Sequence, residues 1–171
     1  MAGMIEAPVT PTQLAASQLI RRLRLPVVLA PMFLVTGPRS VVAGSVSDGA
    51  ALQAVRLLGA DAAYMGTRFI ASEESDAVDE YRQLVVSSSA DEIVLTSEVS
   101  GLNANWLRGS LDKLGYRGEK TGRLEGFSAD DNFKAWKDIW GAGHGVGAVK
   151  GIQSIAEVVA ELETGYRRTN V

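Results

Sequence analysis

The chain has 171 residues, of which 46% are hydrophobic and 22% are charged, and its formal net charge at pH 7 is −3. This composition fits one ordinary globular domain or a part of a larger one, and it argues against a disordered chain and against a nucleic-acid binder, which usually carries excess basic charge. The absence of cysteine excludes disulfides and thiolate metal sites, and a single histidine argues against a histidine-based one, so we expect no metal site.

The sequence also argues against a membrane partner. The longest strongly apolar run, residues 25–35, contains two prolines and is too short to span a bilayer. Glu6 precedes any apolar stretch of signal-peptide length, so the pattern does not predict a secretory signal. We therefore expect a cytoplasmic protein that binds neither membrane nor nucleic acid.

The first predicted elements are a helix and a buried strand. Thr10 and Pro11 are typical of a helix start, and Pro26 ends the apolar pattern that follows them. Residues 27–30 are then continuously apolar, which favours a strand buried on both faces, as in a parallel sheet.

Residues 41–67 predict a strand, a helix and a second strand in parallel. The two strands are the apolar runs at 41–43 and 60–65, and either Ser47 or Asp48 can cap the helix between them. The expected apolar face of that helix consists of Ala51, Leu52, Val55 and Leu58.

Beyond residue 70 the pattern is mainly helical. Residues 72–85 predict a helix with acidic residues in its first turn, and residues 107–114 predict another, ended by Gly115. Residues 93–96 are compatible with a short strand. The last helix is the clearest, because Ser154 and Glu157 form a capping-box pattern before an apolar face at Ile155, Val158, Val159 and Leu162.

Two short loops after predicted strands are the best candidates for a binding site. Gly44-Ser45 and Gly66-Thr67 follow adjacent strands, and backbone N–H groups in such glycine-containing turns bind anions. Two such loops side by side can hold one phosphate. The alternative, that both glycines only shape the turns, stays open.

The glycine-rich run at residues 141–147 contains a formal G-x-G-x-x-A match, but it lacks the preceding strand and the later acidic residue that a dinucleotide site needs. We therefore interpret it as a loop. His144 within it is more typical of a hydrogen-bonding loop residue than of a general base, and the chain contains no G-x-S-x-G nucleophile motif.

Five segments carry a resemblance to a known family. The chain resembles the nitronate monooxygenases, formerly called 2-nitropropane dioxygenases, at residues 25–35, 44–49, 58–69, 96–102 and 140–147. The Met-Gly-Thr-Arg-Phe stretch, together with the preceding Ser-Asp-Gly loop, is the most specific part. Related flavin-dependent enoyl reductases of fatty-acid synthesis share much of this pattern.

The resemblance implies an FMN-binding (β/α)₈ barrel whose phosphate site follows strands 7 and 8. Carried over residue by residue, it implies that the FMN phosphate is held by Gly44, Ser45, Gly66 and Thr67. It also implies that the flavin ring lies against Pro31, Met32 and Phe33.

The chain departs from this pattern in one large respect. A barrel needs roughly 200 residues or more, whereas here the segment that resembles strand 1 is followed almost at once by the one that resembles strand 7. We therefore expect an α/β chain. In it we expect residues 1–70 to form a partial TIM-type barrel that retains strands 1, 7 and 8, and residues 71–171 to form a mainly helical C-terminal extension. The family's mid-chain histidine, the expected base, falls in the missing part, so no catalytic residue is assigned.

The expected function is FMN-dependent oxidation of a small-molecule alkyl nitronate with O₂, impaired in this chain. Two alternatives stay open: a relative of the flavin-dependent enoyl reductases, and a non-catalytic truncated or oligomerising fragment. Because a partial barrel leaves both sheet edges open, we expect the chain to form homo-oligomers or to be loosely packed.

Overall fold

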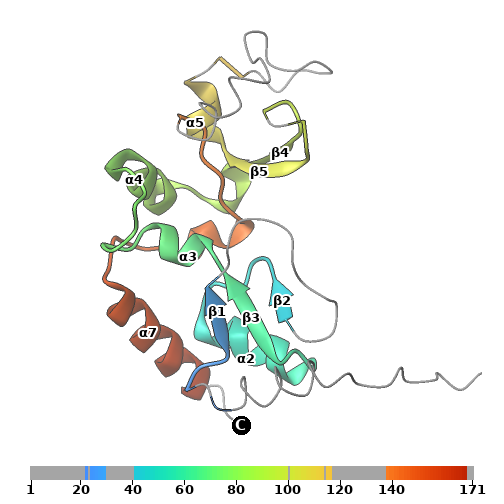
Figure 1. Cartoon of the computed structure of the whole chain (residues 1–171), viewed down its shortest axis with the longest axis vertical. Coiled ribbons are helices and arrows are strands. Elements are labelled where there is room, and N and C mark those ends of the chain that lie inside the picture. Colours follow the sequence, from blue (N-terminus) through green and yellow to red (C-terminus); the bar gives the residue numbers. More distant parts are fainter. Residues whose placement is uncertain are drawn as a thin grey trace, which may run out of the picture.

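The computed structural model describes residues 22, 24–29, 41–99, 101–113, 115, 116 and 138–168. The helix start expected at residues 10 and 11 lies outside these residues. Figure 1 shows a small sheet with helices α2 (Gly49–Leu57) and α7 (Ile155–Arg168) in the lower part of the molecule. The strands β4 (Ile93–Thr96) and β5 (Ala104–Leu107) lie in the upper part with helices α4 (Asp79–Ser87) and α5 (Arg108–Asp112). Helix α3 (Thr67–Ile70) lies between the two parts.

The lower sheet has three parallel strands in the order β1-β3-β2. They are β1 (Val27–Leu29), β2 (Val41–Ala43) and β3 (Ala62–Met65), which confirms the three predicted apolar strands. Because β2 and β3 are neighbours and run parallel, the loops that follow them leave the same end of the sheet side by side.

Helix α2 (Gly49–Leu57) connects β2 to β3. Of the two expected caps it is Asp48 that acts, since its Oδ1 accepts the N–H of Ala51 at 2.7 Å. The expected apolar face is wrong at Leu58, which is 88% exposed. The helix ends one residue earlier than this face required, so Leu58 is the C-cap and the chain turns away there, through Gly59 with φ +99°.

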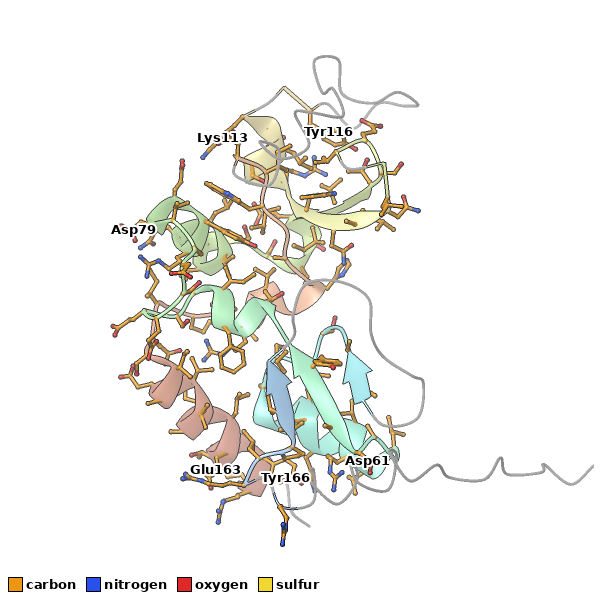
Figure 2. The ribbon with its side chains drawn as sticks, in the orientation of Figure 1. Asp61, Asp79, Lys113, Tyr116, Glu163 and Tyr166 are labelled. Carbon is orange, nitrogen blue, oxygen red and sulfur yellow. The ribbon has the colours of Figure 1, made fainter. Side chains whose placement is uncertain are left out.

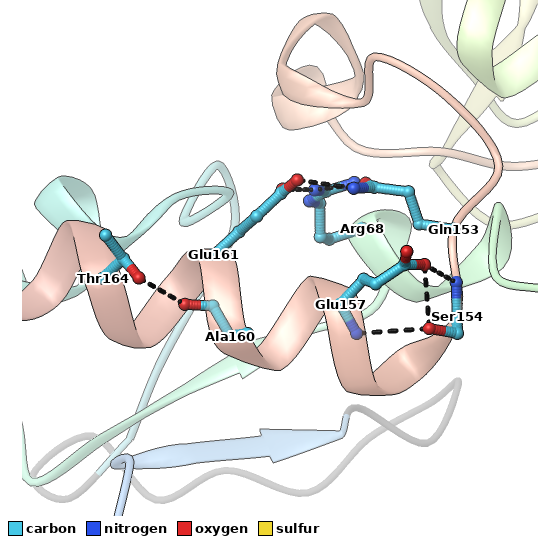
Figure 3. Close-up of polar contacts among 7 residues, drawn as sticks. All are labelled: Arg68, Gln153, Ser154, Glu157, Ala160, Glu161 and Thr164. Atoms are coloured by element: carbon cyan, nitrogen blue, oxygen red, sulfur yellow. Dashed lines mark hydrogen bonds and ion pairs between the residues drawn. The ribbon is translucent and has the colours of Figure 1, made fainter.

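Helix α7 (Ile155–Arg168) completes the core of this lower part. The buried cluster joins residues of α2, β3 and α7 with one residue just before β1 and one just after β2: Leu25, Val46, Leu52, Ala63, Met65, Val158 and Leu162. The expected capping box is present, because Ser154 N donates to Glu157 Oε2 at 2.8 Å and Glu157 N donates to Ser154 Oγ at 3.3 Å (Figure 3). Residues on both sides of position 70 therefore share one core.

Helices α2 and α7 cross at unusually short range. A Cβ built on Gly49 would lie 2.2 Å from Tyr166 N and 2.3 Å from Leu162 O. On the other helix, a Cβ on Gly165 would lie 3.2 Å from Gly49 Cα. Both glycines are needed for this backbone-to-backbone contact.

A buried arginine links α3 (Thr67–Ile70) to α7. The side chain of Arg68 is only 6% exposed, and its Nη2 donates to Gln153 Oε1 at 2.8 Å and to Glu161 Oε2 at 2.5 Å (Figure 3). A buried charge needs such partners, because burying it alone costs several kcal/mol.

The helix expected at residues 72–85 begins later, as α4 (Asp79–Ser87). Ser72 instead forms a β-bridge with Gln153, and both carboxylate oxygens of Glu74 accept the N–H of Ile155, at 3.1 and 2.9 Å. Glu74, which was placed in a first helical turn, thus lies in a loop and holds the start of α7.

The upper part contains a strand pair, of which the sequence predicted only the first strand. After η1 (Ala90–Glu92), strand β4 (Ile93–Thr96) pairs antiparallel with β5 (Ala104–Leu107). Strand β4 confirms the expected short strand. The helix expected at 107–114 is the shorter α5 (Arg108–Asp112), because Leu107 belongs to β5.

Residues 138–149, which end in η2 (His144–Ala148), pack against this strand pair through the buried cluster that includes Leu107 of β5. Trp106 and Trp140 are both buried and belong to the core of the upper part. Within the described residues, none of the helices combines the length and the apolarity that a membrane span requires.

Candidate cofactor site

The first candidate loop has an unusual backbone where it leaves β2. Gly44 has a φ of +96° and Ser45 a φ of +54°, and a Cβ built on Gly44 would meet nothing within 4 Å. Two successive residues with positive φ make a sharp turn, which serine tolerates less well than glycine. The turn leaves open space beside Gly44, so the backbone there is accessible to a ligand.

The second candidate loop leaves β3 beside it. Gly66 precedes α3 as its N-cap, and Thr67 is the first helical residue. Thr67 Oγ1 accepts the backbone N–H of Gly143 at 2.8 Å. A hydroxyl that accepts one hydrogen bond still has its own proton to donate, so Thr67 can also bind a ligand oxygen.

A third loop, at residues 143–145, was not predicted as part of the site but contacts both of these loops. A Cβ on Gly143 would lie 3.3 Å from Thr67 Oγ1, and a Cβ on Gly145 would lie 3.0 Å from the Cβ of Ser47 and 3.5 Å from the Cα of Ser45. Residues 143–145 therefore touch both strand-end loops. The signal that could have shown this is the glycine at every second position from 141 to 147.

Tyr81 of α4 fixes the start of this third loop. Its hydroxyl donates to the carbonyl of Gly141, and its ring stacks on Trp140 with centroids 5.2 Å apart. Burial raises the pKa of Tyr81 to about 12, so the hydroxyl keeps its proton and remains a donor at neutral pH.

His144 lies between the two glycines that touch the strand-end loops, and its side chain is exposed. The structure shows no contact that would make it a general base. Among the residues that the structure describes, no group of three His, Cys, Asp or Glu side chains could hold a metal ion.

A phosphate fits what the residues offer. The candidate site is built from backbone at Gly44, Ser45 and Gly66 and from the hydroxyl of Thr67, and both kinds of group donate hydrogen bonds to phosphate oxygens. The structure thus brings together four of the seven expected site residues. The other three, Pro31, Met32 and Phe33, lie outside the described residues.

Three known proteins show what this chain is similar to. It is 35% identical over 75 residues to the nitronate monooxygenase of Paraburkholderia phytofirmans, a match that covers 44% of this chain and 20% of that protein. The solved structure of FabK from Thermotoga maritima is 20% identical, with a TM-score of 0.59, covering 91% of this chain and 58% of that one. Nitroalkane oxidase from Streptomyces ansochromogenes is 23% identical, with a TM-score of 0.55, covering 75% and 39%.

These matches cover only part of the relatives. The chain spans only a fifth of the length of the Paraburkholderia protein. The family model of nitronate monooxygenase matches residues 40–164, which is well over half of this chain and includes both strand-end loops and the third loop. The chain therefore belongs to the nitronate monooxygenase family.

Proposed function

We propose that the chain binds FMN, with the phosphate between the loops that follow β2 and β3, and that it is a flavin-dependent nitronate monooxygenase with weakened catalysis. Family membership supports the cofactor. The observation that carries the proposal is the strand order β1-β3-β2.

In a closed eight-stranded barrel, strand 8 lies between strands 7 and 1. The order here is the same if β1, β2 and β3 correspond to strands 1, 7 and 8, as the resemblance of their sequences implies. On this assignment strands 2 to 6 are missing between β1 and β2, and the phosphate loops are retained in their original relation.

In this proposal each residue of the site has a binding role. The backbone N–H groups of Gly44, Ser45 and Gly66 and the hydroxyl of Thr67 donate to the phosphate, and residues 31–33 lie against the flavin ring. When bound, FMN supplies the redox chemistry with O₂. The third loop supports the phosphate site by holding Thr67 in place through Gly143.

Oxidation of a neutral nitroalkane also requires that a base remove a proton from carbon. The family's base has no counterpart here, and a positioned general base typically contributes about 10²–10⁴-fold to rate. An anionic nitronate needs no such step. We therefore expect slow flavin-dependent oxygen uptake with nitronates and much slower uptake with neutral nitroalkanes.

The experiment is a titration of the purified protein with FMN and with riboflavin, followed by flavin absorbance and fluorescence. FMN is expected to bind much more tightly, because riboflavin lacks the phosphate. Gly66→Asp should abolish this preference, since it places a carboxylate against the phosphate, whereas Gly66→Asn tests size without charge.

Gly151→Asp is the control for added charge, because a Cβ there meets nothing within 4 Å. Equal affinity for FMN and riboflavin, or an unchanged FMN affinity in Gly66→Asp, would overturn the proposal.

A further inference from the structure

Helix α3 follows directly on the second phosphate loop, but it is too short to keep its own position. It has four residues, Thr67–Ile70, and Gly66 before it makes no side-chain cap hydrogen bond. Isolated helices shorter than about 12–15 residues are only marginally stable in water, so packing against other elements decides where such a helix lies. The position of Gly66 and Thr67 therefore depends on what fastens α3 to the rest of the protein.

One fastening is a closed network of three side chains that begins next to Thr67 (Figure 3). Arg68 Nη2 donates to Gln153 Oε1 at 2.8 Å and to Glu161 Oε2 at 2.5 Å. Gln153 Nε2 in turn donates to Glu161 Oε1 at 2.5 Å, so each of the three side chains contacts the other two. Because Glu161 belongs to α7, the network connects the start of α3 to the first half of α7.

A second fastening holds the other end of α3 through the backbone. Gln153 N donates to the carbonyl of Ala71, the C-cap of α3, at 3.3 Å, and Glu73 N donates to the carbonyl of Gln153 at 3.0 Å. A substitution of a side chain in the network does not remove these backbone hydrogen bonds. Loss of the network would therefore loosen the Thr67 end of α3 while the Ala71 end stays attached.

The burial of the Arg68 guanidinium is only partly offset by the network. The side chain is 6% exposed, and Nη1 has no hydrogen-bond partner among the residues that the structure describes. Replacing a buried ion pair with apolar side chains of similar volume is often neutral or stabilising. Arg68 is therefore a weak source of stability, and the rigid geometry of its donors favours a role in positioning.

We propose that Arg68 is a positioning residue, which through Glu161 and Gln153 holds the loop at Gly66 and Thr67 in the geometry that binds a phosphate. Arg68 acts through this loop and is not itself a ligand of the phosphate. The effect on phosphate binding rests on the proposed function, because the loop is the same. The effect on the position of the loop does not, since it can be measured without flavin.

The first test compares FMN with riboflavin in Arg68→Met, which replaces the guanidinium with an apolar side chain. The preference for FMN is expected to fall at least about tenfold, the equivalent of one charge-assisted hydrogen bond, because the phosphate donors move. The affinity for riboflavin should stay near that of the unmodified protein, because riboflavin lacks the phosphate. A merely structural role of Arg68 would lower both affinities alike, so an unchanged preference would overturn the proposal.

A double-mutant cycle tests whether Glu161 acts through Arg68. Glu161→Gln should also reduce the preference for FMN, because it leaves the buried Arg68 without its charged partner. Adding it to Arg68→Met should cause no further loss, since the arginine is already gone, and losses that simply add would contradict the network. If Arg68→Met does not fold, Glu161→Gln decides, because the Glu161 side chain is 55% exposed. An unchanged preference in Glu161→Gln would then overturn the proposal.

The matched control is Glu163→Gln, two residues further along α7. Glu163 also forms ion pairs, with Arg24 and Arg167, but neither arginine belongs to α3. The control should therefore keep the preference for FMN. An equal loss in the control would overturn the proposal, because it would assign the effect to α7 as a whole.

The second test needs no flavin. The N–H of Gly143 donates to Thr67 Oγ1 at 2.8 Å, so its hydrogen exchange, measured by NMR, reports whether Thr67 keeps its place. Exchange is expected to become at least about tenfold faster in Arg68→Met, as for the loss of one hydrogen bond. The N–H of Gln153, which donates to Ala71, should keep its rate. Unchanged exchange at Gly143 would overturn the positioning role.

The failure of this proposal and that of the proposed function are distinguishable. If the unmodified protein shows no preference for FMN but Arg68→Met still speeds exchange at Gly143, the proposed function is overturned and the positioning role stays intact. If the unmodified protein prefers FMN and neither Arg68→Met nor Glu161→Gln changes that preference, the positioning role is overturned and the proposed function stays intact.

Discussion

Gly143 and Gly145 shape the candidate site because they have no side chain. Each lies so close to a strand-end loop that even a Cβ atom would make a tighter contact than usual, so residues 143–145 can pack on both loops at once. The neighbouring Gly147 has open space around its Cβ position. The run thus contains glycines in tight contact and a glycine in open space, so the effects of adding a side chain at each kind can be compared.

Gly145→Val is expected to push the third loop away from Ser45 and Ser47 and to weaken FMN binding, because valine adds bulk where even a Cβ lies 3.0 Å from Ser47. Gly147→Val should leave the affinity near that of the unmodified protein. Flavin titrations of both variants make the comparison. Equal affinities would show that the third loop does not shape the site.

A carboxylate at the lower end of α7 makes stability depend on pH. Arg24 Nε donates to Glu163 Oε2 at 2.9 Å, and Arg167 Nη2 donates to Glu163 Oε1 at 2.7 Å. Figure 2 shows Glu163 and Tyr166 together at this end of the helix. The hydrogen bond from Arg24 is the main cause that lowers the pKa of Glu163 from 4.5 to about 2, with Arg167 adding to it.

Because the folded pKa of Glu163 lies below its ordinary value, its contribution to stability is complete above about pH 4.5 and is lost as the pH falls toward about 2. The midpoint of urea unfolding should therefore fall steadily as the pH is lowered from about 4.5 to about 2. Glu163→Gln should flatten this dependence, while the exposed Glu73→Gln should keep it. A midpoint that falls equally steeply in Glu163→Gln would assign the acid sensitivity to other groups.

At the scale of elements, the crossing of α2 and α7 holds the lower core together. Gly49 and Gly165 bring the two backbones into contact, and this contact lets Val158 and Leu162 reach the same cluster as Leu52. The atoms that a Cβ on Gly49 would meet belong to the backbone, so no side-chain rotation can relieve the clash.

Gly49→Ala is therefore expected to move α7 away from the sheet and to lower the free energy of unfolding by at least about 1–3 kcal/mol, the usual cost of overpacking. Gly151→Ala is the control, since its Cβ position is open. Thermal and urea unfolding report the difference. An unchanged midpoint in Gly49→Ala would mean that the two helices lie further apart than described.

The elements that the sequence predicted well are those with local signals. Strands β1, β2 and β3 follow from continuous apolar runs, and the start of α7 follows from the capping box at Ser154. The start of α4 could not be predicted in this way, because Ser72 and Glu74 interact with residues 153–155, which are distant in the chain. Strand β5 was hidden for the same reason, since it depends on its pairing with β4.

At the scale of the whole molecule, the lower sheet ends in two strands that pair on one side only within the described residues. Strands β1 and β2 each pair with β3 alone. Close to this sheet, Leu57 is 79% exposed, Leu58 is 88% exposed and Val42 is 37% exposed. Open strand edges and exposed apolar side chains both favour association.

We expect the chain to form dimers or larger species at micromolar concentrations. Light scattering after size exclusion measures this, and replacing Leu57 and Leu58 together with lysine should shift the distribution toward monomer. Exchanging the already exposed Gln83 for lysine is the control for added charge. A sharp monomeric peak with cooperative unfolding would contradict the expectation.

The candidate site was predictable only in part. Gly44, Ser45, Gly66 and Thr67 could be identified because two strand-end loops and a family resemblance point to the same residues. Gly143 and Gly145 were not identified, because the repeated glycines of their run indicate close packing but not which segments they contact. Their contacts are with Thr67 and Ser47, which are distant in the chain.

The strand order also sets when the chain can fold during its synthesis. Strand β1 leaves the ribosome first, but its neighbour β3 follows only after β2 and α2, so β1 must wait unpaired. The cluster around Leu52 and Ala63 then lacks Val158 and Leu162 until about a hundred further residues have emerged. Closing such long loops delays folding. The lower core is therefore completed only after α7 has been synthesised, and until then the apolar strands of the nascent chain lack this cover.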